Sequence, residues 1–259
     1  MKTFIKNRND NKIAVVVEKK PDARGLVFIM HGLGGFKEQP HVQTFAEVFR
    51  ENNFTTVLFD ATHTFGESEG LYEDATTTNY YEDLEDVINW AKGQSWYKEP
   101  FWLVGHSQGA VSIALYAKKY PAQVKAMAPI STSLNGPLLV EAEQRRRSSE
   151  YEKWEKTGIQ EYPSMSKPGV IKRLNWYKYK ADIFKYDLLK FAPELNMPTL
   201  LVAGDKDWIT PPKYQKMFFE KLPGKKELHI IKNAPHTFKN PKHLAEIKII
   251  FDKWIKNNL

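Results

Sequence analysis

The stretch VGHSQGA, residues 104–110, places Ser107 between two glycines directly after the apolar run of residues 101–104. Ten serines and 14 glycines scattered at random over 259 residues would give only about 0.03 G-x-S-x-G matches, so chance is a poor explanation of this one. The apolar run before the motif predicts a buried strand, and the residues after it predict a helix. The motif therefore predicts a sharp strand-to-helix turn with the Ser107 hydroxyl at its tip.

Apolar runs and helical patterns alternate along most of the chain. Residues 3–17 predict a β-hairpin, and further strands are expected at residues 26–30, 55–60, 101–105, 124–130, 199–204 and 227–231. Helices are expected between or after them, at residues 40–52, 78–92, 107–119, 212–221 and 242–257. This alternation requires crossover connections and a sheet covered on both faces. The sequence thus predicts an α/β fold with a mostly parallel, eight-stranded sheet.

Residues 134–191 interrupt the alternation. They are rich in charged and aromatic residues and contain no clear strand. A long stretch without sheet character inside a compact domain is usually a functional insertion. We therefore expect a mostly helical cap at residues 134–191, inserted into a core domain formed by residues 1–133 and 192–259. The aromatic residues of the cap either line a substrate pocket or form a small core of its own, and the sequence favours neither.

The composition narrows the function classes. The chain has no cysteine, which excludes disulfides, thiol nucleophiles and cysteine-ligated metals. No apolar run approaches the ~20 residues that span a bilayer, and the N-terminus lacks the apolar core of a signal peptide. The net charge of +7 arises after residue 140, but its only dense cluster, RRR at 145–147, lies in no nucleic-acid-binding motif. We expect a cytoplasmic protein that binds neither nucleic acid nor, stably, a membrane.

A serine hydroxyl is a weak nucleophile unless a base takes its proton, so a histidine and an orienting acid should follow Ser107. Among the seven histidines, His236 lies in a loop after the last predicted strand, at the edge where sites of open α/β sheets form. The others fall in glycine motifs, a polar loop, a strand or helices predicted at the surface: His31, His106, His63, His229, His41 and His243. Two carboxylates after residues 199–204, those of Asp205 and Asp207, compete for the role of the acid.

The loop HGLGG, residues 31–35, follows the strand predicted at residues 26–30. Its glycines allow backbone N–H groups to face inward, beside the N-terminus of the helix that follows Ser107. Such groups stabilise the negative charge that develops on a carbonyl oxygen under attack. We expect the backbone N–H groups of Leu33 and Gln108 to form this oxyanion hole, although the same loop is also compatible with a simple glycine-rich turn.

Five segments carry a resemblance to one family: HGLGG (31–35), FDATHTFGESEG (59–70), GHSQG (105–109), GDKDWITP (204–211) and NAPH (233–236). With them the chain resembles α/β-hydrolase-fold serine hydrolases, in the branch of cinnamoyl (feruloyl) esterases, monoacylglycerol lipase-like enzymes and small carboxylesterases. The resemblance covers nearly the whole chain outside the cap. It implies a triad of Ser107, Asp207 and His236, because the acid of this family is the Asp of G-x-x-D-x-x-x-P. The chain departs from the family after Asp60, where THTF stands in place of an Arg-Gly core.

The resemblance implies cleavage of carboxylic esters of small to medium acyl or aromatic acids through an acyl-serine intermediate, with no metal and no cofactor. It also implies a cap between the sixth and seventh strands, and we expect Gly32, Leu134, Trp176 and Ile209 to line the substrate pocket. A serine at the turn argues against the dehalogenases and epoxide hydrolases of this fold, which usually use an aspartate. Thioesterase, amidase or peptidase, acyltransferase and C–C bond hydrolase activities share the triad and stay open.

A protein that kept the fold for binding without turnover is the alternative of another class. Such proteins usually lose a member of the triad, whereas this chain has all three. The expected partner is a small-molecule ester, and the sequence leaves a monomer and a homodimer open.

Overall fold

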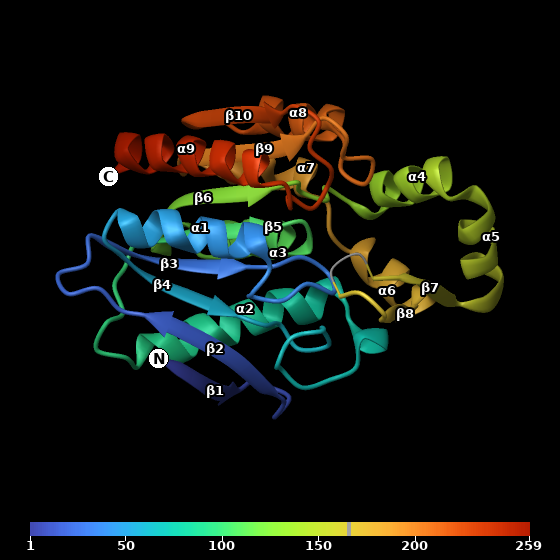
Figure 1. The fold of residues 1–259 in the computed structure, drawn as a ribbon, viewed down its shortest axis with the longest axis horizontal. Coiled ribbons are helices and arrows are strands. Elements are labelled where there is room, and N and C mark those ends of the chain that lie inside the picture. The colour runs from blue at the N-terminus through green and yellow to red at the C-terminus, as the bar shows by residue number, and fades with distance from the viewer. Residues whose placement is uncertain (165–166) are drawn as a thin grey trace.

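The structure, a computed structural model, describes residues 1–164 and 167–259. Its main feature is an eight-stranded sheet in the order β1-β2-β4-β3-β5-β6-β9-β10 (Figure 1). β2 is antiparallel to both β1 and β4, and the remaining neighbours are parallel. The strands are Lys2–Lys6 (β1), Lys12–Glu18 (β2), Gly25–Met30 (β3), Phe54–Phe59 (β4), Phe101–His106 (β5), Val124–Ile130 (β6), Thr199–Gly204 (β9) and Lys226–Ile231 (β10). The predicted α/β fold class is confirmed.

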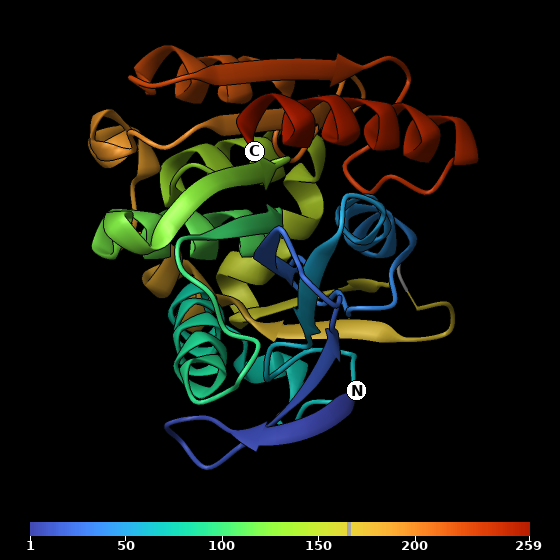
Figure 2. The ribbon, with the colours of Figure 1, turned by 90° about the vertical axis from the view of Figure 1, so that its left-hand side faces the viewer.

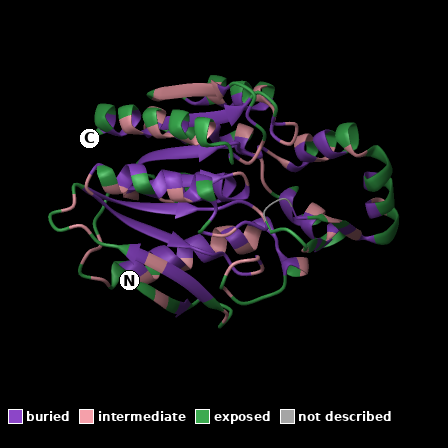
Figure 3. Cartoon of the chain, viewed as in Figure 1, coloured by how far each residue is buried: buried purple, intermediate pink, exposed green. Residues whose placement is uncertain are grey.

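The central strands are mostly apolar because helices cover both faces of the sheet, although β4 includes the buried Thr55 and Thr56. Every residue of β3, β4, β5 and β9 is buried, as Figure 3 shows for the middle of the molecule. The edge strand β10 is mostly half-buried. This gradient of burial explains why the central strands were the plainest signals in the sequence.

Two layers of helices enclose the sheet. The helices α1 (Pro40–Glu51) and α9 (Pro241–Asn258) pack on one face, and α2 (Thr77–Lys92) and α3 (Gln108–Lys119) pack on the other (Figure 2). The helix α8 (Pro212–Lys221) joins the core of α2 and α3. Short 3₁₀ turns lie at Tyr72–Asp74 (η1), Pro121–Gln123 (η2) and Ala192–Glu194 (η3). In the described part of the chain, no helix combines the length and the apolar character needed to cross a membrane.

Most of the chain between β6 and β9 forms a separate group of elements at one end of the molecule (Figure 1). They are α4 (Gly136–Arg146), α5 (Ser148–Thr157), β7 (Ile159–Pro163), β8 (Ile171–Asn175) and α6 (Trp176–Ile183). The short helix α7 (Leu188–Phe191) lies instead against α3 and α8. Residues 165 and 166 of the predicted cap lie outside the described residues. The division into a core domain and a cap at residues 134–191 stays a prediction.

The expectation that residues 134–191 contain no strand is wrong. β7 and β8 pair antiparallel as a two-stranded sheet of their own. In IQEYP the buried position 160 is a glutamine, and in IKRLN the charged residues Lys172 and Arg173 lie on opposite faces, so neither sequence has the apolar alternation that marks a strand. The pairing depends on packing against the rest of the insertion and the core, which no local pattern announces.

Candidate active site

Ser107 lies at the turn between β5 and α3, and its backbone is strained. Its φ of 53° and ψ of −112° fall outside the regions that serine ordinarily adopts. The two flanking glycines are needed for close packing around this turn. A Cβ on Gly105 would lie 2.4 Å from the Gly109 carbonyl oxygen, and one on Gly109 would lie 2.5 Å from the His31 carbonyl oxygen. The G-x-S-x-G pattern therefore reflects the close approach of β3, β5 and α3.

A continuous chain of hydrogen bonds joins Ser107, His236 and Asp207. His236 Nε2 lies 2.9 Å from Ser107 Oγ, and His236 Nδ1 lies 2.8 Å from Asp207 Oδ2. The ionised carboxylate can only accept, so Nδ1 carries the proton of the neutral ring. Nε2 is then the acceptor for the serine hydroxyl. This arrangement is the one in which a histidine acts as a general base toward a serine.

Asp207 is held ionised by its surroundings. Its side chain is buried, and its oxygens accept hydrogen bonds from the backbone N–H groups of Ile209 and Thr210 and from the Thr210 hydroxyl. Burial alone would raise the pKa of Asp207, but His236 and the Thr210 donors outweigh it and lower this pKa to about 2. Asp205, the competing carboxylate, is exposed and lies beside Lys206. The two candidates left open by the residues thus differ sharply in environment.

His106 supports the loop that carries His236. Its Nε2 lies 2.8 Å from the His236 carbonyl oxygen, which can only accept, so Nε2 is the donor. Burial and the neighbouring His236 lower the pKa of His106 to about 3, so the ring is neutral near pH 7. His41, predicted at the surface, is instead fully buried with its ring 4.4 Å from that of His106. That prediction was wrong because α1 presents His41 on the same buried face as Phe45.

The loop after β3 lies against Ser107. A Cβ on Gly32 would lie 3.0 Å from Ser107 Cβ, so a larger residue here would crowd the Ser107 turn. The loop is fixed by His31, whose Nε2 accepts from the Ala61 N–H and whose Nδ1 lies 2.8 Å from the Gly32 carbonyl oxygen. Gly34 N–H donates to the Tyr80 hydroxyl at 3.0 Å. These contacts hold the backbone of the predicted oxyanion loop in one conformation.

A buried lysine supports the segment in which the chain departs from its relatives. Lys37 Nζ lies 2.7 Å from Asp60 Oδ2 and 2.6 Å from Glu67 Oε2, and its backbone N–H donates to Asp60 Oδ1. Glu38 completes the set at 2.9 Å. Burial lowers the pKa of Lys37, but these carboxylates raise it well above its usual range. The loops after β3 and β4 are therefore joined by a buried ion pair, a role that the sequence did not indicate.

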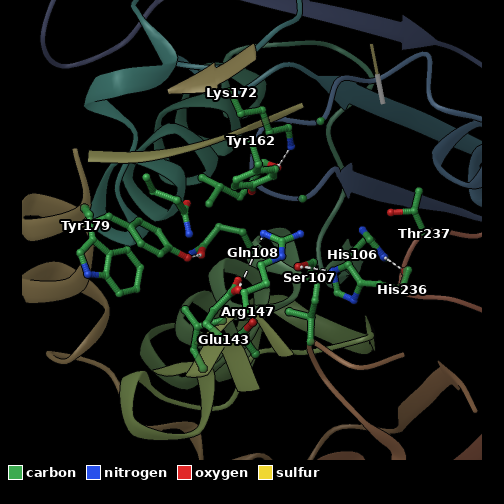
Figure 4. A pocket seen from close by; sticks show the side chains of 18 of the residues that line it. His106, Ser107, Gln108, Glu143, Arg147, Tyr162, Lys172, Tyr179, His236 and Thr237 are labelled. Carbon is green, nitrogen blue, oxygen red and sulfur yellow. Dashed lines mark hydrogen bonds and ion pairs between the residues drawn. The ribbon is translucent and has the colours of Figure 1, made fainter. Parts of the chain in front are cut away.

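A pocket of about 100 Å³ opens beside Ser107 and His236 (Figure 4). Of the residues predicted to line it, Gly32, Trp176 and Ile209 do so, and Leu33 and Gln108 also contribute to its wall. Leu134, the fourth predicted lining residue, lies instead in the hydrophobic core. The aromatic residues of the insertion divide between the two roles considered, since Tyr162, Trp176 and Tyr179 line the pocket while Tyr151 and Trp154 pack behind them.

The pocket also contains charged residues that the sequence did not reveal. Lys172 from β8, Glu143 from α4 and Arg147 from the junction of α4 and α5 all contribute to its lining (Figure 4). Burial lowers the pKa of Lys172 to about 8 and raises that of Glu143 to about 7. Arg147 belongs to the RRR cluster, whose other two members are exposed. Over residues 1–164 and 167–259, no three His, Asp or Glu side chains are grouped so as to hold a metal ion.

Comparison with known proteins identifies the family. A family model described as "Serine aminopeptidase, S33" (Hydrolase_4) matches residues 21–155, about half of the chain. A second model, described as "PhoPQ-activated pathogenicity-related protein", matches residues 103–259. The chain belongs to the α/β-hydrolase families that these models describe. An uncharacterized 31.7 kDa protein in the traX-finO intergenic region of Escherichia coli is 24% identical over 90% of this chain and 91% of its own length.

Solved structures of other α/β-hydrolases have the same fold. Est1E from Butyrivibrio proteoclasticus, solved with ferulic acid bound, superposes with a TM-score of 0.82 at 20% identity over 99% of this chain and 98% of its own. The mouse α/β hydrolase domain-containing protein 10 gives 0.79 at 19% identity, over 99% of each chain. A monoacylglycerol lipase from Paleococcus ferrophilus gives 0.72 at 21% identity, over 95% of this chain and 99% of its own. Because the chain belongs to these families and has this fold, we conclude that the protein is a hydrolase.

Proposed function

We propose that this hydrolase cleaves carboxylic esters through an acyl-serine intermediate, with Ser107 as nucleophile, His236 as general base and Asp207 as the acid that orients it. The observation that carries the proposal is the unbroken chain of hydrogen bonds from Asp207 through His236 to Ser107, at the edge of a pocket. The strained backbone of Ser107 supports it, because such strain persists only where the surrounding structure requires it.

In the proposed reaction, Ser107 Oγ forms a bond to the ester carbonyl carbon while His236 Nε2 takes the hydroxyl proton. Collapse of the tetrahedral intermediate breaks the bond to the alcohol, which leaves with the proton from His236. A water molecule then attacks the acyl-serine and gives a proton to His236. The bond between the acyl carbon and Ser107 Oγ breaks, Oγ takes this proton back from His236, and the acid is released. Asp207 stabilises the positive charge that His236 carries in both steps.

The backbone N–H groups of Leu33 and Gln108 are the proposed donors to the oxyanion. Gln108 is the first residue of α3, and the first N–H groups of a helix have no partner within the helix. Leu33 lies in the loop whose backbone is held by His31 and Tyr80. Donors held in place before the reaction need no reorganisation as the charge develops.

Ester cleavage is favoured over aminopeptidase activity by the charge of the pocket. An aminopeptidase must accept the ammonium group of a peptide N-terminus, whereas this pocket holds two cations, Lys172 and Arg147, and its one carboxylate, Glu143, already faces Arg147. Structural relatives named as an esterase domain and a monoacylglycerol lipase support the ester class by analogy. We further propose that the insertion at residues 134–191 acts as a cap over a small-molecule substrate.

The test combines labelling with turnover. The purified protein is treated with a fluorophosphonate probe and assayed on 4-nitrophenyl esters of increasing chain length, a feruloyl ester, an acyl thioester and an aminoacyl anilide. We expect labelling and ester turnover in the wild type, loss of both in Ser107→Ala, and no change in Ser95→Ala, which removes an exposed hydroxyl. Ester turnover that survives Ser107→Ala would contradict the proposal. Faster cleavage of the thioester or the anilide would show that the preferred substrate is a thioester or an amide instead of an ester.

A further inference from the structure

Two lysines are buried among the described residues, and they differ in the charged groups that surround them. Lys37 is 2% exposed and contacts the carboxylates of Asp60, Glu67 and Glu38. Lys172 is 7% exposed, and within the described residues no carboxylate lies within ion-pairing distance of it. A buried charge is ordinarily paired, so the unpaired ammonium of Lys172 requires an explanation.

Lys172 faces the pocket because of the register of β8. It shares the buried face of the strand with Leu174, while Ile171 is turned outward and is 59% exposed. A shift of one residue would turn Lys172 and Leu174 outward and bury Ile171 together with Arg173. Hydrophobicity therefore does not decide between the two registers, and the observed one places the Lys172 ammonium in the pocket.

The ammonium group lies against the predicted oxyanion loop. Lys172 Nζ donates to the Leu33 carbonyl oxygen at 3.3 Å, and a Cβ on Gly34 would come within 2.8 Å of it. Its other neighbours are aromatic faces, with the Tyr72 centroid at 5.5 Å and the Tyr162 centroid at 5.8 Å. The Lys172 ammonium therefore contacts the carbonyl oxygen of Leu33, the residue whose backbone N–H is proposed to bind the scissile carbonyl oxygen.

A second cation strengthens the positive field in the pocket. The Arg147 guanidinium lies 4.6 Å from the Tyr162 ring centroid, on the ring that Lys172 also contacts. Its only carboxylate neighbour among the described residues is Glu143, at 3.8 Å. If Glu143 is ionised it balances Arg147, and if it is protonated both cations are uncompensated. The pocket is positively charged in either case, and Lys172 is its unpaired member (Figure 4).

One further buried donor in the pocket has no acceptor. Gln108 Oε1 accepts from the Tyr179 hydroxyl at 3.1 Å, which leaves Nε2 of the same amide buried and without a partner among the described residues. Unsatisfied buried donors are uncommon, and here one occurs in the same cavity as an unpaired ammonium. Both groups would be satisfied by an acceptor that bears negative charge.

We propose that the substrate of this enzyme carries a carboxylate in addition to the ester that is cleaved, and that Lys172 binds this carboxylate beside the oxyanion loop. The inference rests on the proposed ester hydrolysis and names its substrate class. Lys172 is then a residue that determines specificity, and the scissile ester and the free carboxylate lie on opposite sides of Leu33.

The test uses two pairs of esters that differ by one charge. The first pair, mono-4-nitrophenyl adipate and its methyl ester, places the carboxylate on the acyl side. The second pair, the butyrate esters of 4-hydroxybenzoate and of methyl 4-hydroxybenzoate, places it on the alcohol side. In each pair the measured quantity is the ratio of kcat/KM for the anionic ester to that for the neutral ester. Comparing this ratio between variants cancels the intrinsic reactivity of the esters.

We expect Lys172→Met to lower this ratio about tenfold or more in one pair, which also identifies the side that bears the carboxylate. Lys172→Arg, which keeps the charge, should retain part of the preference. Lys153→Met is the matched control, because it removes the same charge from an exposed position of the insertion and should leave the ratio unchanged. An unchanged ratio in both pairs for Lys172→Met would overturn the inference.

Binding without turnover separates this inference from the proposed function. In the Ser107→Ala protein, millimolar monomethyl adipate should raise the melting temperature more than the neutral dimethyl adipate, and Lys172→Met should abolish the difference. If the wild type cleaves no ester and is not labelled by a fluorophosphonate, the proposed function fails, but this binding difference still decides the carboxylate site. Equal stabilisation by the two adipates would count against that site even if neutral esters are cleaved.

Discussion

His106 donates a hydrogen bond from Nε2 to the backbone carbonyl oxygen of His236, 2.8 Å away, and so fixes the loop that holds the proposed base. We predict that His106→Ala lowers kcat by about 10- to 100-fold with little change in KM, because a displaced base affects the chemical step more than ground-state binding. Steady-state kinetics on a 4-nitrophenyl ester measure the two constants separately.

The control for this prediction is His229→Ala, which removes a partly exposed imidazole from β10. His106→Gln can still donate from its amide and should recover part of the lost kcat. An effect of His106→Ala on KM alone would show that the hydrogen bond does not position His236.

The two neighbouring carboxylates after β9 give a second prediction. Asp207→Asn should lower kcat by about 10⁴-fold, because an amide donor facing Nδ1 favours the tautomer that cannot accept the serine proton. Asp205→Asn makes the same chemical change at an exposed position and should leave kcat nearly unchanged. Comparable losses in both variants, measured by the kinetics of ester hydrolysis, would contradict the assignment of Asp207 as the acid.

The sequence was most informative where one physical constraint acts alone. Strands such as residues 26–30 and 101–105 are buried on both faces and are therefore apolar throughout, which any reader of the sequence can recognise. The hairpin at residues 159–163 and 171–175 was missed because it satisfies several constraints at once. Each face of residues 171–175 carries one aliphatic and one basic residue, Leu174 with Lys172 and Ile171 with Arg173, so hydrophobicity does not indicate which face is buried.

In the candidate site, too, the residues that a local sequence pattern marks could be predicted, and the residues placed by tertiary packing could not. Ser107 was found because a strained turn between a strand and a helix requires a local pattern of glycines. Arg147 and Lys172 carry no such pattern, since a charged residue in a charged segment is usually solvated. Arg147 faces inward only because the helix ends there, between α4 and α5, with φ of −139° and ψ of 49°. The catalytic roles of the triad stay a prediction, although His236 lies within hydrogen-bonding distance of both Ser107 and Asp207.

The buried ion pair that joins the loops after β3 and β4 gives a third prediction. Lys37→Met should lower the free energy of unfolding by about 3 kcal/mol or more, because it leaves the fully buried carboxylate of Asp60 without a countercharge. Urea unfolding measures this change, with exposed Lys153→Met as the control. Stability equal to that of the wild type would mean that the pair makes no net contribution to folding.

For Lys172, the second buried lysine, we predict the opposite effect on the free energy of unfolding. Lys172→Met removes a charge that has no carboxylate partner among the described residues. Burial and the nearby Arg147 lower the pKa of Lys172 from 10.5 to about 8, a shift equivalent to roughly 3 kcal/mol. We therefore expect Lys172→Met to be more stable than the wild type at pH 7, by an amount of that order at most.

The pH dependence of this difference follows from the sign of the shift. Between pH 8 and pH 10.5 the folded wild type binds fewer protons at Lys172 than the unfolded chain, so its stability rises with pH. The advantage of Lys172→Met should therefore be largest at pH 7 and shrink as the pH approaches 10. Arg147, Tyr72 and Tyr162, which surround Lys172, are common to both proteins, so their own titration largely cancels in the difference. Urea unfolding of both proteins between pH 7 and pH 9.5 measures the difference in their free energies of unfolding. A difference that stays constant would show that Lys172 keeps its full charge throughout that range.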